Sequence, residues 1–112
     1  MISNGDDRLG VLRKNYQDAD DNEGNDLSKA TTKDLVRAIQ RNWSDARDAY
    51  IGRLASELSA TTQGADNAYR DAQTAVEAVK VARANSEQIA DLIKKMQKAT
   101  AAAELLVKAA AS

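Results

Sequence analysis

Apolar residues recur every three or four positions over residues 33–60, and this spacing predicts an amphipathic helix. The helix would begin at Thr31 or Thr32, because a threonine hydroxyl can accept a hydrogen bond from one of the first unpaired amides of a helix. It would end before Gly64, where hydroxyl-bearing residues lead into a glycine. Its apolar face consists of Leu35, Ile39, Trp43, Ala46, Tyr50, Leu54 and Leu58.

A stricter repeat covers residues 65–110. Positions taken in alternating steps of three and four are apolar throughout, except at Ser86 and Thr100. A period of seven held over more than six repeats indicates a helix that supercoils around a partner helix. Most of these positions are alanine, which lets backbones approach closely but buries little apolar surface per turn. We therefore expect a coiled coil that is weak per turn and gains strength from length or from added copies.

The two predicted helices differ in length, at roughly 42 Å and roughly 69 Å for a rise of about 1.5 Å per residue. In an antiparallel hairpin the second helix would extend past the first from about residue 93, leaving an apolar strip uncovered. Such a strip is typical of a binding surface. The sequence therefore predicts an all-α fold: a helical hairpin with a long alanine-rich coiled-coil second helix, which packs against itself or another helical protein. The uncovered residues would be Ile93, Met96, Leu105, Leu106 and Val107.

An alternative places a break in the second helix near Asn85/Ser86. Asn85 and Gln88 have the spacing of a capping box, and a break there would give a compact three-helix bundle. Such a bundle would act as a monomeric binding module for one protein partner. The segment contains no glycine or proline, and the seven-residue repeat continues through it, so the sequence favours the continuous helix.

Residues 1–28 differ in composition from the rest of the chain. They contain three basic and seven acidic residues, for a net charge of −4, together with three of the five glycines. Residues 29–112 carry thirteen basic and ten acidic residues, for a net charge of +3. Segments rich in charge and glycine bury too little apolar surface to offset the entropy of ordering. We expect an acidic, mobile N-terminal arm over residues 1–28 and a helical domain over residues 29–112.

The composition excludes several kinds of chemistry. The 112 residues include 22 alanines but no Pro, Cys, His or Phe. Without thiols or imidazoles the chain has no Cys/His zinc site, no Ser-His-Asp triad and no disulfide. Residues 18–24 look like a calcium loop, but the twelfth position is Lys29 instead of a glutamate. Asp45, Asp48 and Glu57 have no second titrating group placed to share acid–base work. We expect no metal, no cofactor, no small-molecule substrate and no catalysis.

Charge and hydropathy narrow the range of partners. A net charge of −1 and the absence of aromatic residues after Tyr69 argue against nucleic acid as a partner. No apolar run reaches the length of a membrane span, and residues 99–111 lack the aromatic and basic residues of a membrane-surface helix. Peripheral membrane binding through the C-terminal helix is thus a minor alternative. The first residues lack the pattern of a signal peptide, so we expect a protein that is cytoplasmic as synthesised, with any export by another route.

In general build, a small cysteine-free helical hairpin with a polar N-terminus resembles small secreted subunits of bacterial export systems. These include needle and filament proteins and the Trp-x-Gly hairpin proteins. Trp43-Ser44-Asp45 departs from the Trp-x-Gly motif and lies within a predicted helix, and the chain has no proline-bearing turn of the needle type. The resemblance is one of architecture, and it implies a secretion-type or filament role only by analogy.

These observations predict a non-enzymatic assembly or adaptor subunit that acts through coiled-coil packing. Aromatic residues on the first helix would anchor the contact, because they can bury large apolar surfaces while keeping a polar tip in water. The predicted interaction residues are Trp43, Tyr50, Leu54, Ile89, Ile93, Met96, Ala103, Val107 and Ala110.

Overall fold

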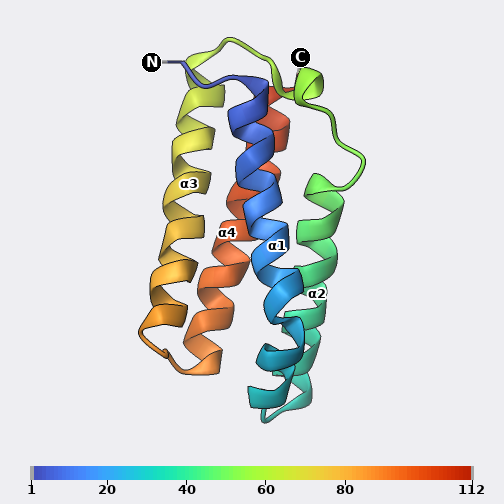
Figure 1. Cartoon of the computed structure of the whole chain (residues 1–112), viewed down its shortest axis with the longest axis vertical. Helices are drawn as coiled ribbons and strands as arrows, with labels where there is room; N and C mark the ends of the chain where they lie inside the picture. The colour runs from blue at the N-terminus through green and yellow to red at the C-terminus, as the bar shows by residue number, and fades with distance from the viewer. Residues whose placement is uncertain (1, 112) are drawn as a thin grey trace.

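The computed structural model describes residues 2–111, which form four α-helices, one short 3₁₀ helix and no strand. The all-α fold expected from the sequence is confirmed. The helices alternate in direction to give an up-and-down bundle of 44 × 26 × 18 Å (Figure 1). The elements are α1 (Gly5–Lys29), α2 (Lys33–Tyr50), η1 (Ala55–Leu58), α3 (Gln63–Ala84) and α4 (Ile89–Ala110).

The bundle consists of two antiparallel hairpins, α1–α2 and α3–α4 (Figure 1). α4 packs against all three other helices, whereas α2 and α3 make no contact with each other in the described part of the chain. The segment that includes η1 crosses the upper end of the bundle, as drawn in Figure 1, and joins the two hairpins. Its chain is tied there by a hydrogen bond from the Ala60 amide to the Ala110 carbonyl (3.1 Å).

The start of α2 is the one predicted from the sequence, because the Thr32 side chain accepts a hydrogen bond from the Leu35 amide (3.2 Å). The helix ends earlier than expected, at Tyr50 instead of residue 60. Gly52 then adopts a left-handed conformation (φ 79°) that turns the chain away from the helix axis. Leu54 and Leu58 therefore do not extend the apolar face of α2, and Leu58 is instead the buried last residue of η1.

The continuous helix predicted over residues 65–110 is wrong, because the chain turns between Ala84 and Ile89. The turn is a Schellman motif, in which the Glu87 amide bonds to the Ala82 carbonyl and the Ser86 amide to the Arg83 carbonyl. Ser86 adopts the left-handed conformation (φ 53°) that glycine usually supplies. The break lies where the three-helix alternative placed it, but the bundle has four helices.

The predicted mobile arm over residues 1–28 is also wrong, because residues 5–28 belong to α1. The helix begins with a capping box, in which Asn4 and Asp7 each accept a hydrogen bond from the other's backbone amide. α1 buries Val11, Leu12 and Ala19. These few apolar residues are enough to hold α1 in the bundle, because polar side chains of α1 also bond to each of the other three helices.

The apolar core has two parts. The upper part joins both hairpins and contains Val11, Leu12, Leu58, Ala65, Ala72, Ala103, Leu106 and Ala110. The lower part contains only α3 and α4 residues: Ala75, Val79, Ala82, Leu92, Met96 and Ala99. Most positions of the seven-residue repeat are thus buried within the chain, α3 against α4. The expected uncovered strip is absent, since Ile93, Met96 and Leu106 are buried and Val107 is partly so; only Leu105 is exposed.

Candidate functional site: the outer surface of α1

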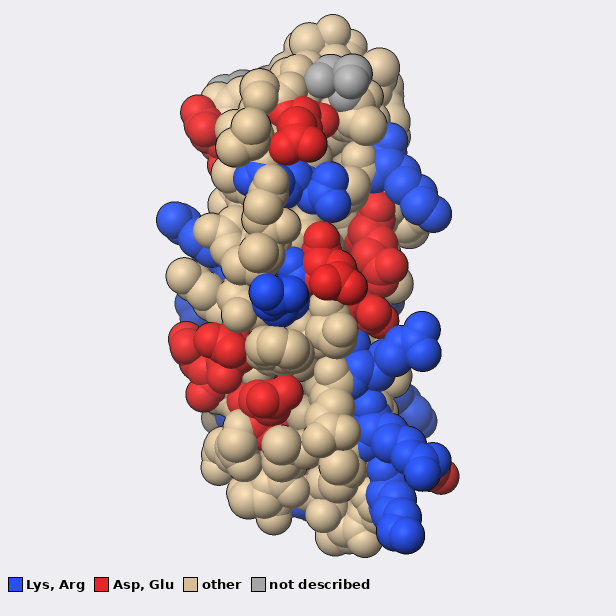
Figure 2. All heavy atoms as spheres, turned by 90° about the vertical axis from the view of Figure 1, so that its right-hand side faces the viewer, with Lys and Arg blue, Asp and Glu red and all other residues tan. Residues whose placement is uncertain are grey.

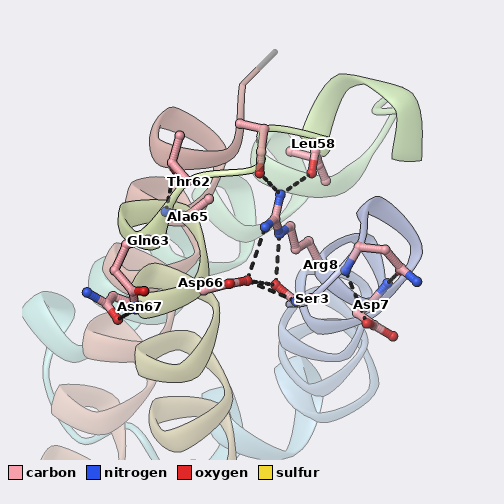
Figure 3. Close-up of polar contacts among 11 residues, drawn as sticks. Ser3, Asp7, Arg8, Leu58, Thr62, Gln63, Ala65, Asp66 and Asn67 are labelled. Atoms are coloured by element: carbon pink, nitrogen blue, oxygen red, sulfur yellow. Dashed lines mark hydrogen bonds and ion pairs between the residues drawn. The ribbon is translucent and has the colours of Figure 1, made fainter. Parts of the chain in front are cut away.

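The upper end of α1 is fixed by Arg8, whose side chain is 1% exposed. Its guanidinium points toward the start of α3 and the segment after η1 (Figure 3). It donates hydrogen bonds of 2.7 Å to the carbonyls of both Leu58 and Ala60, and of 3.0 Å to the Ser3 hydroxyl. An ion pair with Asp66 (3.3 Å) completes the network. A buried guanidinium needs this many acceptors, because an unpaired buried charge is strongly destabilising.

Asp66 links the beginnings of α1 and α3. It accepts hydrogen bonds from the Ser3 hydroxyl (2.7 Å) and from the Ser3 amide (2.9 Å) (Figure 3). These two bonds lower the pKa of Asp66; burial opposes the shift, and the guanidinium of Arg8 adds to it. The network holds the first turns of both helices in a fixed relation.

The lower part of α1 is held by Arg83 of α3. The guanidinium donates paired hydrogen bonds to Asp18 (2.8 and 2.9 Å) and to Asp26 (2.8 and 3.0 Å). Burial disfavours the charged guanidinium, but the bonds to Asp26 and Asp18 outweigh it and raise the pKa of Arg83. Farther up, Asn15 donates a hydrogen bond to the Thr100 hydroxyl on α4 (3.1 Å).

An aromatic cluster joins α1 to α2. The Tyr16 ring lies 6.2 Å from Trp43 and 5.9 Å from Tyr50, measured between centroids. Trp43 also donates a hydrogen bond to Asp20 (2.9 Å). Trp43 and Tyr50, predicted as anchors for a partner, therefore contact α1 of the same chain.

With its inner side occupied by these contacts, α1 presents its first three turns outward between two hollows. The larger hollow, of about 470 Å³, lies between α1 and α3, and the smaller, of about 260 Å³, between α1 and Tyr50 of α2. Asp6, Gly10 and Arg13 line both hollows. We call this region the Gly10 surface; it consists of Asp6, Asp7, Leu9, Gly10, Arg13 and Lys14 on α1, Tyr50 on α2, and Tyr69, Gln73 and Glu77 on α3.

The Gly10 surface combines two partly buried tyrosines with separated charges. Tyr50 and Tyr69 lie on opposite sides of Gly10. Burial, with a smaller contribution from Asp7, raises the pKa of Tyr69, so its hydroxyl keeps its proton at neutral pH. Tyrosine and arginine are enriched in protein–protein interfaces, since both pair a large contact area with directional hydrogen bonds. The chemistry of this surface suits recognition of a protein.

Packing within the chain gives no reason for glycine at position 10. A side chain added there would meet no atom within 4 Å, whereas one added at Gly5 would overlap the Ala55 carbonyl oxygen. Glycine in a helix interior costs about 0.5–1 kcal/mol relative to alanine. Gly5 is therefore explained by the close approach of η1. Gly10 lowers the stability of the helix, and no contact within the chain requires a glycine at that position.

Other surfaces are less organised. Figure 2 shows acidic and basic side chains interspersed over the face that α2 occupies, with basic side chains gathered along one edge of its lower half. Lys33, Arg37 and Arg41 follow each other at four-residue spacing on α2 and are exposed. Inside the lower half, Asn42 is buried and its side-chain oxygen has no hydrogen-bond partner. None of these features combines a hollow with both aromatic and charged side chains.

The structure does not bring the predicted interaction residues together on one outer surface. Tyr50 is the one that reaches the Gly10 surface. Leu54 is exposed beside η1. Sequence reasoning missed the charged residues and the glycine of the Gly10 surface, because it treated residues 1–28 as unfolded. The signal that indicates a helix there is the three-residue spacing of Asn4 and Asp7, which suits a capping box. The remaining predicted residues are buried (Ile93, Met96, Ala103, Ala110) or partly buried (Trp43, Ile89, Val107).

Residues 2–111 contain no cluster of three acidic side chains close enough to hold a metal ion. None of the described helices is long and apolar enough to cross a membrane. No protein-family model matches the sequence, and comparisons with curated proteins and with solved structures find no significant match.

Proposed function

We propose that this protein is a non-enzymatic helical assembly or adaptor subunit that binds another helical protein through the Gly10 surface. The observation that carries the proposal is the position of Gly10 between two hollows. A Cβ would meet nothing within 4 Å at Gly10 or at Gly24 on the same helix, but Gly24 lines neither hollow. Glycine is the residue that permits close approach of another backbone. A partner that packs on α1 would need a residue without a side chain at position 10, and the binding would offset the helix stability that glycine costs.

The shape of the surface favours a helix as the partner element. Helices pack by fitting the side-chain ridges of one into the grooves of the other, at interaxial distances of about 8–10 Å. A helix laid across Gly10 would place its side chains in the hollows on either side of α1, against Tyr69 and Tyr50. Small residues at the crossing point bring the two axes toward the short end of that range.

The repeat over residues 65–110 supports this proposal less than the sequence suggested. Its apolar positions on α3 and α4 cover each other, so a partner could reach them only by opening the bundle. The same burial removes most of the apolar face through which α4 would bind a membrane. An interaction through α1 requires no rearrangement of the core.

A photo-reactive amino acid can test the proposal while the partner is still unidentified. Placed at Gln73, which lines the larger hollow, it should form a discrete protein adduct on irradiation of cells that produce the protein. The matched control is Gln97, an exposed glutamine on α4 that lines neither hollow. A second change, Gly10→Glu, should remove the adduct formed from position 73. Absence of an adduct at 73, or an adduct that persists with Gly10→Glu, would contradict the proposal.

A further inference from the structure

The charges of α1 are arranged with opposite sign and equal spacing on either side of Gly10. Asp6 and Lys14 each lie four residues from Gly10, and Asp7 and Arg13 each lie three residues from it. All four side chains are exposed and line the larger hollow. The α1 part of the surface therefore has an acidic half and a basic half related by reversal of the helix direction, while Glu77 of α3 adds one more carboxylate to the larger hollow.

We propose that the helix that occupies the Gly10 surface is α1 of a second copy of this chain, antiparallel to the first and related to it by a two-fold axis at Gly10. This inference rests on the proposed function and names its partner. In a two-fold interface, contacts come in reciprocal pairs. Antiparallel packing centred on Gly10 places Asp6 opposite Lys14 of the second copy and Asp7 opposite Arg13 of the second copy. Each pair forms twice, and no like charges among these four positions face each other.

Gly10 lies where the two helices would come closest. A side chain at the crossing point would separate the axes, whereas two glycines leave the backbones free to approach. The hollows of about 470 and 260 Å³ on either side then receive side chains from the second copy. Tyr50, Tyr69 and Leu9 supply apolar surface for that contact.

The strength of the dimer follows from its composition. Exposed ion pairs add little affinity individually and are screened by salt, with a Debye length of about 8 Å at physiological ionic strength. The apolar contribution is limited to the two tyrosines and the aliphatic residues beside them. We expect a reversible dimer that weakens as ionic strength rises, in contrast to a salt-insensitive obligate dimer.

Sedimentation equilibrium across concentration and ionic strength measures this association. Gly10→Gln should weaken the dimer at least tenfold, because two glutamines would meet at the crossing point. The matched control is Gly24→Gln on the same helix, where an added side chain also meets no atom within 4 Å. Gly24 lines neither hollow, so its variant should dimerise as the original chain does. Circular dichroism should show that both variants keep their helix content.

A charge exchange tests the two-fold pairing. Asp6 and Lys14 are used because Asp7 also caps the helix. Asp6→Lys alone and Lys14→Glu alone should each weaken the homodimer, since each places like charges opposite each other. An equimolar mixture of the two variants should form a heterodimer, and a chain with both changes should dimerise again. Dimerisation that neither change affects, or that neither the mixture nor the double variant restores, would overturn the pairing.

A chain that stays monomeric at every concentration would overturn this inference but not the proposed function. The adduct formed at position 73 separates the two. An adduct with the mass of two chains supports the two-fold dimer. One of any other mass contradicts the second copy as partner, and it supports the proposed function only if Gly10→Glu removes it. The absence of any adduct contradicts both.

Discussion

Arg8 and Asp66 form a polar network inside a bundle whose core is otherwise built largely from alanine and leucine. Arg8 is the largest of the fully buried side chains. Its two carbonyl partners belong to the segment that joins the hairpins, so one side chain fixes α1, the linker and α3 together. Replacing only one member of such a network leaves the others buried without partners, and for this reason each member matters more than a surface ion pair does.

Acid should weaken the fold through Asp66. The pKa of Asp66 is lowered in the folded chain from an ordinary value of 3.8, so its contribution to stability is present above that value. The contribution is lost as the pH falls below 3.8 toward the folded pKa. The original chain and Asp66→Asn should therefore be compared by urea unfolding between pH 2 and 7. The difference between their free energies of unfolding should narrow as the pH falls below 3.8. Asp71→Asn, at an exposed site on the same helix, is the control; if its difference narrows equally, the network is not the cause.

Residues with local partners could be predicted from the sequence, and residues with distant partners could not. Thr32 caps the amide three residues ahead of it, so the start of α2 was readable from a short stretch of sequence. Arg8 and Asp66 are 58 positions apart, and nothing near either residue indicates the other. The Gly10 surface could not be predicted for the same reason, because its residues come from three helices that meet only in the folded chain.

At the scale of elements, the turn between α3 and α4 shows how a helix can end without the usual signals. The Schellman hydrogen bonds are complete, but Ser86 holds the left-handed position in place of glycine. A non-glycine residue in that conformation costs roughly 1 kcal/mol. The packing of α3 on α4 offsets this cost, and the apolar repeat continues across the turn because each helix presents one apolar face to the other. A period of seven therefore did not distinguish one long helix from two antiparallel ones.

Ser86→Gly should stabilise the protein by about 0.5–1 kcal/mol, because glycine adopts the left-handed conformation without the steric cost of a Cβ. The increase would appear as a higher urea midpoint with an unchanged slope. Ser86→Ala keeps the Cβ and should show no such gain, which separates relief of backbone strain from loss of the hydroxyl. An unchanged midpoint for Ser86→Gly would mean that the turn is not strained.

At the scale of the whole molecule, the two hairpins are joined differently at their two ends. The upper core contains residues from both hairpins, whereas the lower core contains residues of α3 and α4 alone. Beyond Ala19, Asp26 is the single buried residue of α1. The lower contact between α1 and α3 therefore rests largely on Arg83 and its two carboxylates.

Arg83→Met should destabilise the fold by about 3 kcal/mol, because it leaves the fully buried Asp26 without its partner. The loss of stability should be concentrated in the lower half of the bundle, where Arg83 joins α3 to α1. Hydrogen exchange should accelerate most at the amides of residues 20–29, while those of α4 facing the lower core stay protected. Arg70→Met, at an exposed site on α3, should change neither quantity. Uniform acceleration over all four helices would show that the two halves do not open separately.

The two ends of the described chain lie together at the upper end of the bundle (Figure 1). Ser3 bonds to the first turn of α3, and Ala110 bonds to the segment that leads into the same helix. Chain ends that lie close together can be joined by a short linker and the chain opened elsewhere. A circular permutant that begins at Thr31 and ends at Ala30 would keep every helix, both core clusters and the Arg8 and Arg83 networks. Unchanged helix content and cooperative unfolding of that permutant would show that the contacts of this bundle depend on which helices meet, and not on the order in which the chain supplies them.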